Sequence, residues 1–374
     1  MSIKTVSDVM QEVFEGSHFK CLPYDKRNLD EDPYSEYAEY DHRIKGKTFE
    51  HPTNNSVAPI PTVGVREDEP SILKYFMDGS RRVFRFSDIV LDDGRYYPVL
   101  AGQVGVAVLQ RTSDGSMSPM REYTRYEHIL VLPDTIDRAD RQAIRDAMSS
   151  GRLKFDVTDY ETGASGGTGS EDYINKGTKK ILDRMHDIEL DAVRRMMENR
   201  DLRNDAMLVV DGSLQFRRDV LKRNNFPVTQ LANVIGISKS FTPSQPVIGM
   251  KGGKHIGTVL QSLEFAQRTP VFKAGEDAFA DILGVWYLRL RPRQKMTSPL
   301  AGVIKVEVLA NGTEIDDGLE RDRVDHLSAL ILSERNVTPY GSDSRWANHI
   351  YPIFLTETYL KSGFLSDIYF KGLL

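Results

Sequence analysis

The sequence predicts a mixed α/β fold, built on one sheet with helices on its faces. Three β-prone runs follow one another at 72–78, 81–91 and 97–111, which favours an antiparallel meander. A long helical pattern at about 173–200 precedes an apolar run at 206–211, and alternation of helix and strand favours parallel pairing. We therefore expect a sheet that is antiparallel in its first part and parallel in its second.

Composition sets outer limits on the function. The chain has 374 residues, of which 40% are hydrophobic and 28% charged, as in a globular protein of one large or two ordinary domains. No apolar stretch approaches the roughly 20 residues of a membrane span, and the N-terminus lacks a secretory pattern. The single cysteine, Cys21, excludes an intramolecular disulfide and a cysteine-based zinc site. We expect a cytoplasmic protein that does not bind membranes.

The chain divides into an appendage and a main domain. Residues 1–70 are expected to form an N-terminal appendage, with a helix at 5–15 and then a polar, acidic stretch of irregular structure. Residues 71–374 form the main domain. Within it, the Gly- and Ser-rich stretch 160–172 predicts a flexible loop.

The remaining elements follow from local patterns. The Asp-Gly pair within 91–97 predicts a hairpin between two strands. Further strands are expected at 126–133, 231–240, 283–291 and 301–309. Further helices are expected at 134–150, 216–224, 319–335 and about 352–361. The stretch 247–275 is expected to be irregular. Pro352 suits the first position of the last helix.

The tripeptide Asp-Gly-Ser occurs twice, each time after an apolar run. Asp78 follows Tyr75-Phe76-Met77 and Asp211 follows "AMLVV". Taken alone, each tripeptide is typical of an ordinary turn. Two carboxylates at the ends of neighbouring strands would instead face one point beyond the sheet, where open α/β sheets build their sites.

Paired carboxylates of this kind favour a divalent metal site. Two close carboxylates repel each other, and Mg²⁺ or Mn²⁺ relieves the repulsion through oxygen ligands. With a third acid, two metals could promote an in-line phosphoryl displacement. We expect that acid to be Glu189 in "MHDIELDAV", because Ile188 and Ala192 place it on the apolar side of the long helix. Glu198, near the polar helix end, is the alternative.

Basic residues follow the first of the two tripeptides. Although the net charge is −5, Arg81, Arg82 and Arg85 could form a local basic stripe that contacts DNA phosphates. A solvated strand face is the alternative interpretation of such a cluster.

The order of these motifs resembles that of the NurA nucleases. The resemblance is carried by "FMDGSRR", a hairpin, a helix bearing Glu, "LVVDGSL", "VIGISKS" and a late "YP" that opens a helix, over about residues 72–362. It implies a ribonuclease-H-like core and a DNA nuclease, exo- or endonucleolytic, that uses Mn²⁺ or Mg²⁺. It also implies a homodimer working with a hexameric HerA-type ATPase, in DNA repair or antiphage defence.

The resemblance also implies roles for individual residues. Asp78, Glu189 and Asp211 would be the metal ligands. Lys239, in "GISK", would lie near the phosphate, and Tyr287, in "WYLRLRP", would be an aromatic residue of the site. The family often has a histidine after "YP", where this chain has Glu357; His349, just before Tyr351-Pro352, is the other candidate for the fourth site residue.

Two rival functions remain. An actin-like ATPase would share the core, but "GMKGGKHIG" does not have the spacing of a P-loop. A non-catalytic nucleic-acid-binding or assembly subunit would keep the fold with a decayed site. Metal-dependent DNA cleavage and ATP hydrolysis distinguish the three.

Overall fold

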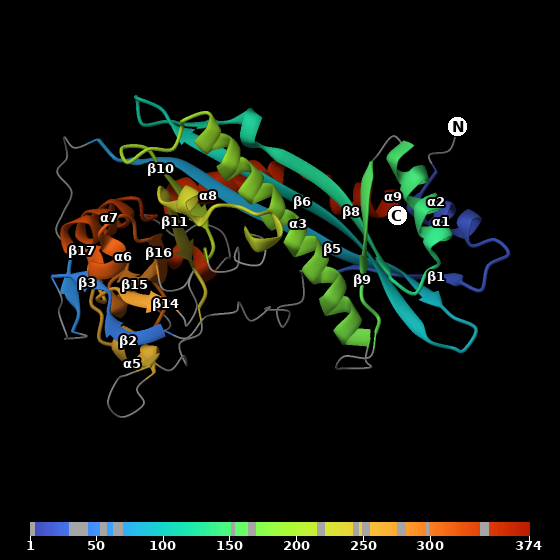
Figure 1. Cartoon of the computed structure of the whole chain (residues 1–374), viewed down its shortest axis with the longest axis horizontal. Coiled ribbons are helices and arrows are strands. Elements are labelled where there is room, and N and C mark those ends of the chain that lie inside the picture. Colours follow the sequence, from blue (N-terminus) through green and yellow to red (C-terminus); the bar gives the residue numbers. More distant parts are fainter. Residues whose placement is uncertain are drawn as a thin grey trace.

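The molecule, described from a computed structural model, is organised around one large mixed sheet that runs through its length (Figure 1). The structure describes residues 4–29, 44–52, 58–62, 70–150, 154–163, 170–214, 221–241, 247–248, 255–274, 282–296, 299–336 and 344–374. The strands are β1 (Lys20–Asn28), β2 (Ile44–Thr48), β3 (Glu50–His51), β4 (Ile60–Pro61), β5 (Leu73–Val90), β6 (Tyr96–Arg111), β7 (Met117–Pro119), β8 (Arg125–Pro133), β9 (Phe155–Tyr160), β10 (Met207–Asp211), β11 (Val234–Ser238), β12 (Val247–Ile248), β13 (Gln267–Arg268), β14 (Phe272–Ala274), β15 (Leu283–Arg289), β16 (Val303–Leu309) and β17 (Leu319–Glu320). The α-helices are α1 (Val6–Val13), α2 (Arg138–Ser150), α3 (Ser170–Glu198), α5 (Ile256–Leu260), α6 (Glu314–Asp317), α7 (Arg321–Ser333), α8 (Tyr351–Ser362) and α9 (Asp367–Leu373).

Five neighbouring strands, in the order β8-β6-β5-β10-β11, form the middle of the sheet. β5 pairs antiparallel with β6, and β6 pairs antiparallel with β8, so these three strands form an antiparallel meander. It is not the meander that the runs 72–78, 81–91 and 97–111 predict, because the first two of these runs are one strand, β5. β10 lies parallel to β5, and β11 lies parallel to β10. The predicted fold class, a mixed α/β sheet with flanking helices and extra strands, is confirmed.

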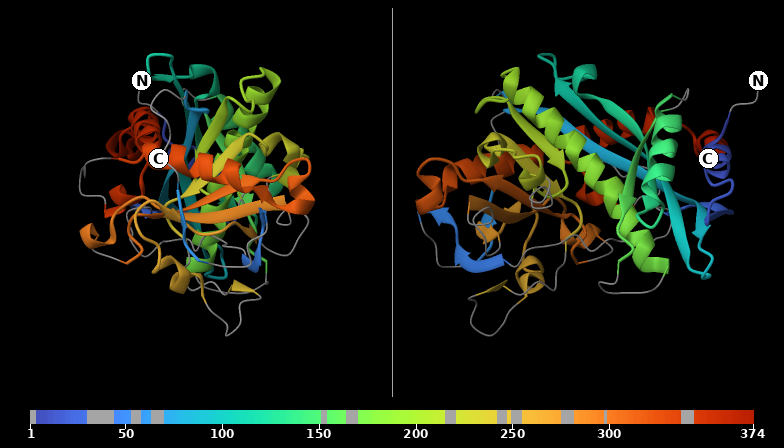
Figure 2. Two further views of the ribbon diagram at one scale, coloured as in Figure 1. Left: turned by 90° about the vertical axis from the view of Figure 1, so that its left-hand side faces the viewer. Right: turned by 45° about the vertical axis from the view of Figure 1, so that its right-hand side comes forward.

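Two helices cover opposite faces of these strands. On one face, a Cβ added to Gly102 of β6 would lie 2.9 Å from Ile181 of α3. At Gly105, three residues along the same strand, it would lie 2.9 Å from Leu360 of α8. Residues an odd number of positions apart point to opposite faces of a sheet. Figures 1 and 2 accordingly show α3 and α8 on different sides of the strands.

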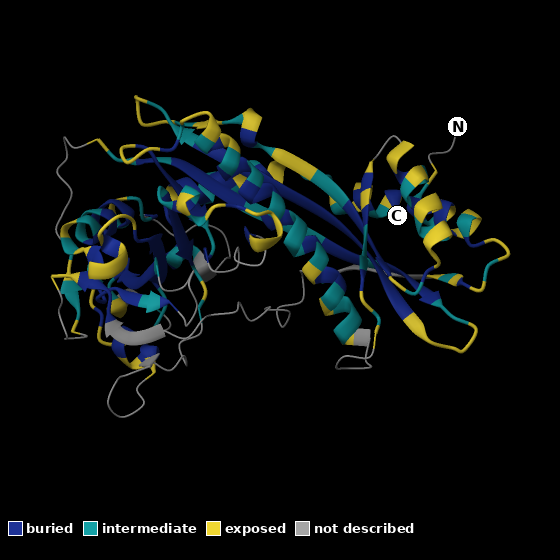
Figure 3. Ribbon diagram, viewed as in Figure 1, coloured by how far each residue is buried: buried dark blue, intermediate teal, exposed yellow. Residues whose placement is uncertain are grey.

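Because both faces are covered, the long central strands are buried along most of their length (Figure 3). This explains why β6 has a nearly continuous apolar sequence instead of an alternating one. An ionisable side chain on such a strand needs a partner or a function, since isolated buried charges are costly. Asp78 of β5 is such a residue.

β5 is continuous, although the sequence predicts two strands with a turn at Asp78-Gly79-Ser80 between them. The strand has 18 residues and pairs with β6 straight through this tripeptide, with Asp78 opposite Ala107 and Gly79 opposite Val106. The predicted turn is therefore wrong. The unbroken ladder to β6 outweighs the turn preference of the sequence, as tertiary context often does. The predicted hairpin after β5 is confirmed, with Gly94 at φ 82°.

The N-terminal segment contributes strands to the sheet, so the prediction of irregular structure there is wrong. β1 pairs antiparallel with β5, with Lys20 opposite Val90, and β2 pairs with β12 and β14. The polar sequence of β1 has no alternating apolar pattern, which is why it was not predicted as a strand. The expected first helix corresponds to α1, where Ser7 donates a backbone hydrogen bond of 3.0 Å to Leu374.

Most other predicted elements are confirmed. They correspond to α2, α3, α7, α8, β8, β10, β11, β15 and β16. The sequence did not predict β9 and α9, nor the short elements β12, α5, β13 and β14 within the stretch 247–275. Most of the predicted helix at 216–224 and the middle of the predicted loop at 160–172 lie outside the described residues. No helix in the described part of the chain is long and apolar enough to cross a membrane.

Candidate active site

Asp78 and Asp211 lie side by side where β10 ends against β5. The last paired residues of these parallel strands are Val210 and Met77, so the following residues, Asp211 and Asp78, lie on neighbouring strands at the same level. Neighbouring strands are roughly 4.8 Å apart. Although Asp78 is within β5 rather than at its end, the prediction that the two strands are adjacent is confirmed.

Asp78 is a buried carboxyl group in a negative environment. Its residue is 5% exposed, and within the described residues no hydrogen bond or ion pair reaches its carboxylate. Burial, followed by the charges of Asp211, Glu357 and Glu189, raises the pKa of Asp78 well above its usual value, while Lys239 opposes the shift. The ionised form of Asp78 is therefore unfavourable in the metal-free protein.

Lys239 is the cation of this group. It follows β11, and its Nζ lies 2.7 Å from Oδ2 of Asp211 and 3.6 Å from Oε2 of Glu357. Burial alone would lower the pKa of Lys239, but Asp211, Glu357 and Asp78 more than reverse this effect and raise it. Lys239 therefore carries its charge at any ordinary pH and partly neutralises three carboxylates.

Of the two candidates for the fourth site residue, Glu357 is the one that contacts this group. It lies on α8, and its Oε2 is fully buried without a hydrogen bond from any described residue. Its other oxygen, Oε1, accepts a 2.5 Å hydrogen bond from Lys361. Burial opposes ionisation, but Lys239 and Lys361 outweigh it and lower the pKa of Glu357. His349 is 2% exposed and adds a smaller effect in the same direction.

Glu189 approaches from the other face of the sheet. It is 1% exposed on α3, and its Oε2 lies 2.9 Å from Nδ1 of His186. Its carboxylate lies directly over Gly79, the residue after Asp78, and has the smallest charge effect on the Asp78 pKa. The alternative acid, Glu198, is exposed at the end of the helix. His186 was not predicted, although its position three residues before Glu189 on one helix could have indicated it.

Gly79 makes the approach of Glu189 possible. A Cβ added there would overlap the Glu189 carboxylate, lying 3.1 Å from its Cδ and 3.3 Å from Cε of Met185. We expect Gly79→Ala to displace Glu189 and to lower the free energy of unfolding by about 1–3 kcal/mol, as overpacking does. Thermal unfolding measures the loss. Gly163→Ala is the control, because nothing lies within 4 Å of a Cβ there; equal stability of the two variants would contradict the expectation.

Tyr287 does not contact the carboxylates through any described interaction. It lies in β15, which β16 separates from β11, and is fully buried. Its ring packs edge-on against the ring of Phe241, with 5.0 Å between the ring centroids. Phe241 is two residues after Lys239 in the sequence. A direct role for Tyr287 in the site stays a prediction.

The three arginines after Asp78 have different environments. Arg82 donates hydrogen bonds to Asp367 at 2.8 Å and to the carbonyl of Leu365 at 3.1 Å. Arg85 forms a two-pronged ion pair with Asp88 and lies seven residues from Asp78, roughly 23 Å along the strand. Arg81 is half-buried and is the one of the three that is nearest to Asp78 along β5. Their role as phosphate contacts stays a prediction.

The residues present fit a divalent cation by charge, although they are not arranged as a formed metal site. Among the described residues, no three His, Cys, Asp or Glu side chains are grouped so that they could hold a metal ion. However, Asp211 and Glu357 both pair with the ammonium group of Lys239, the charge of Asp78 acts on the same group, and Oε2 of Glu357 is a buried acceptor without a hydrogen bond. Carboxylate oxygens of this kind are the ligands that Mg²⁺ and Mn²⁺ prefer.

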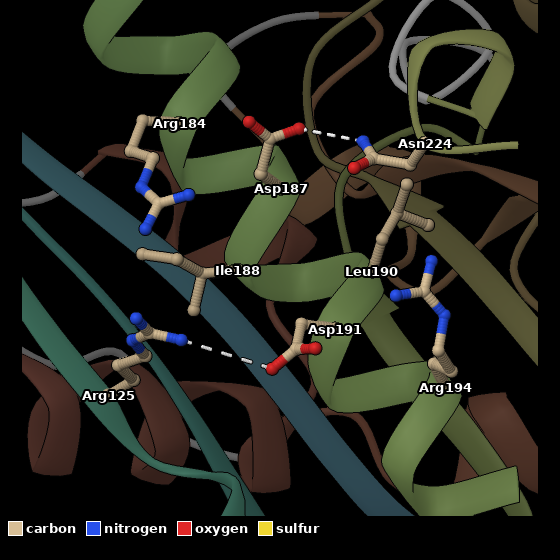
Figure 4. Close-up of a pocket in the computed structure, with 8 residues that line it drawn as sticks. All are labelled: Arg125, Arg184, Asp187, Ile188, Leu190, Asp191, Arg194 and Asn224. Carbon is tan, nitrogen blue, oxygen red and sulfur yellow. Dashed lines mark hydrogen bonds and ion pairs between the residues drawn. The ribbon is translucent and has the colours of Figure 1, made fainter. Parts of the chain in front are cut away.

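A polar surface hollow on the outer side of α3 is separate from these carboxylates. Its volume is about 170 Å³, and none of its lining residues is a predicted site residue. Asp187 accepts a hydrogen bond of 2.9 Å from Asn224, and Asp191 lies 4.0 Å from Arg125 (Figure 4). Its acidic side chains are thus already paired with neighbours.

Models of known protein families give no match to this chain, and a search of curated proteins gives none either. Its function must therefore be inferred from its own residues and their geometry.

Proposed function

We propose that the protein is a metal-dependent DNA nuclease that hydrolyses phosphodiester bonds. The observation that carries the proposal is the cluster at the end of β10, where the carboxyl groups of Asp78, Asp211 and Glu357 gather near one buried lysine, Lys239. Glu357 also pairs with Lys361, which is half-exposed. Ionisation of all three carboxyl groups is unfavourable in the metal-free protein, which is why the pKa of Asp78 is raised, and it would become favourable if a divalent cation bound. The resemblance of the motif order to the NurA nucleases agrees with this proposal.

In this proposal, Asp78, Asp211 and Glu357 would hold Mn²⁺ or Mg²⁺, with Glu189 available from the other face. Bound there, the metal would lower the pKa of a water molecule and stabilise negative charge on the phosphate. Asp78 must lose its proton before it can act as a ligand, so metal binding should release protons. Lys239, freed from Asp211 by the metal, could place its ammonium group against a phosphate of the substrate.

A non-catalytic nucleic-acid-binding or assembly subunit is the second candidate. The observation that favours it is the 2.7 Å ion pair between Nζ of Lys239 and Oδ2 of Asp211, because a cation is already bound to one of the proposed metal ligands. An ion pair retained in place of a metal would be typical of a decayed site. The two candidates differ in whether the protein binds Mn²⁺.

The deciding experiment is a cleavage assay on linear double-stranded and single-stranded DNA with Mn²⁺, Mg²⁺ or EDTA. We expect cleavage that depends on the metal, tested with the protein alone and with a hexameric HerA-type ATPase, the proposed partner of a homodimer. Asp211→Asn is the control for contaminating nucleases. Intact DNA under all these conditions would exclude the nuclease, and Mn²⁺ binding measured by calorimetry would then be expected to be absent too. ATP hydrolysis by this chain alone would instead support an actin-like ATPase.

A further inference from the structure

The chain reverses direction directly after Asp211. The backbone N–H of Gly212 donates a 2.7 Å hydrogen bond to the carbonyl of Ile237 on β11, and Gly212 has φ 115°. This angle lies in a region that favours glycine, which explains the second Asp-Gly pair. The next residues then cross over β11 instead of continuing β10.

The crossing is possible because β11 has a glycine at that position. A Cβ on Gly236 would lie 3.0 Å from the carbonyl oxygen of Gly212 and 3.2 Å from the backbone nitrogen of Leu214. The cross-strand neighbour of Gly236 on β16 is Glu307. A long carboxylate on one strand can therefore reach over a bare glycine on the next.

Glu307 uses this space to hold the reversed segment. Its Oε2 accepts hydrogen bonds from Oγ of Ser213 at 2.8 Å and from the backbone N–H of Leu214 at 2.6 Å. Its Oε1 lies 3.2 Å from Nζ of Lys305, two residues earlier on the same strand. Glu307 and Ser213 are 0% and 3% exposed, and Lys305 is 1% exposed.

Burying such an ion pair brings little stability by itself, since well-packed apolar residues often serve a fold equally well. The buried charges of Glu307 and Lys305 can instead fix the backbone next to Asp211. A carboxylate that accepts a backbone N–H and is itself paired with a cation has little freedom to move.

We propose that Glu307, with Lys305 as its counterion, is a positioning residue that fixes Asp211 for metal binding. The role rests on the proposed function, because it assumes that Asp211 is a ligand. Outer residues that orient metal ligands typically contribute a factor of about 10–100 to metal affinity. Loosening the segment after Asp211 should therefore weaken Mn²⁺ binding without removing any ligand.

The test is Glu307→Gln, compared with Glu314→Gln in the full-length protein. Glu314 is a matched control, because it is also buried, accepts backbone hydrogen bonds from Asn311 and Glu320, and pairs with Arg323, all away from the carboxylate cluster. We expect Glu307→Gln to weaken Mn²⁺ binding about 10–100-fold, to recover cleavage at high Mn²⁺, and to speed amide hydrogen exchange at 212–214. Glu314→Gln should leave all three unchanged.

Equal Mn²⁺ affinity of Glu307→Gln and wild type, or an equal loss in both variants, would overturn the positioning role. If Glu307→Gln does not fold, Ser213→Ala removes one of the hydrogen bonds to Glu307 and should give a smaller loss in the same direction. Wild-type protein that binds no Mn²⁺ would overturn the proposed function and the ligand role together. Hydrogen exchange would still test the anchoring of 212–214: unchanged protection in Glu307→Gln would contradict it.

Discussion

Asp78→Asn is expected to abolish cleavage and at the same time to stabilise the metal-free protein. The loss of activity should be about 1,000-fold or more, because a missing metal ligand removes several kcal/mol of transition-state stabilisation. The gain in stability has a separate cause, since burial and the neighbouring carboxylates raise the pKa of Asp78. Asparagine has a similar shape without the charge, so we expect a gain of the order of 1 kcal/mol in the free energy of unfolding.

The pH dependence gives the sign of this effect. A carboxyl group whose pKa is raised by folding binds its proton more tightly in the folded state, so stability falls as the pH rises above the unfolded value of 3.8. The advantage of Asp78→Asn should therefore be absent at lower pH and grow as the pH rises through the folded-state pKa. Thermal unfolding between pH 3 and pH 8, without metal, measures it.

The matched control for this variant is Asp88→Asn on the same strand. Asp88 is also buried, but it forms a two-pronged ion pair with Arg85, so removing its charge should lower stability and leave cleavage intact. Added Mn²⁺ should raise the unfolding temperature of wild type and of Asp88→Asn, and leave Asp78→Asn unchanged. A metal-dependent rise in Asp78→Asn equal to that of wild type would show that Asp78 is not a ligand.

The sequence was informative where local pattern and topology agree. Two apolar runs ending in an aspartate predicted that Asp78 and Asp211 meet, because a strand, a helix and a second strand favour parallel neighbours. The same local pattern misled at Gly79, where a tripeptide typical of a turn is part of a long strand. Whether a Gly permits a turn or gives space to a distant side chain, here Glu189, depends on contacts that no local pattern contains.

Long-range contacts could not be predicted from single positions. The choice between Glu357 and His349 depends on how α8 packs against the end of β11, where Lys239 lies, although these segments are far apart in the sequence. In the same way, the strand "VIKVEVL" shows two inward charges, Lys305 and Glu307, but not that they meet the segment after Asp211. Such polar residues in an apolar strand indicate a function or a partner without identifying either.

Lys239→Met is expected to destabilise the metal-free protein by about 3–5 kcal/mol at neutral pH, since breaking its buried ion pair leaves the carboxylate of Asp211 without its counterion. The pKa of Lys239 is raised by folding, so its contribution is fully present below the unfolded value of 10.5 and is lost only as the pH rises above it. Between acidic and neutral pH, the loss of stability in Lys239→Met should therefore vary with the ionisation of the neighbouring carboxylates, since the lysine itself stays charged over this range. It should shrink as acid protonates Asp78 and its neighbours, and it should shrink when Mn²⁺ replaces the missing charge.

Lys361→Met is the control that separates this effect from the loss of any lysine near Glu357. Lys361 also pairs with Glu357, but its side chain is 49% exposed, so its removal should cost at most about 1 kcal/mol. Unfolding by urea at several pH values, with and without Mn²⁺, measures both variants. If the loss in Lys239→Met were the same at every pH and were unaffected by Mn²⁺, it would reflect lost packing of the lysine stem. Lys239 would then not be the counterion of a metal site.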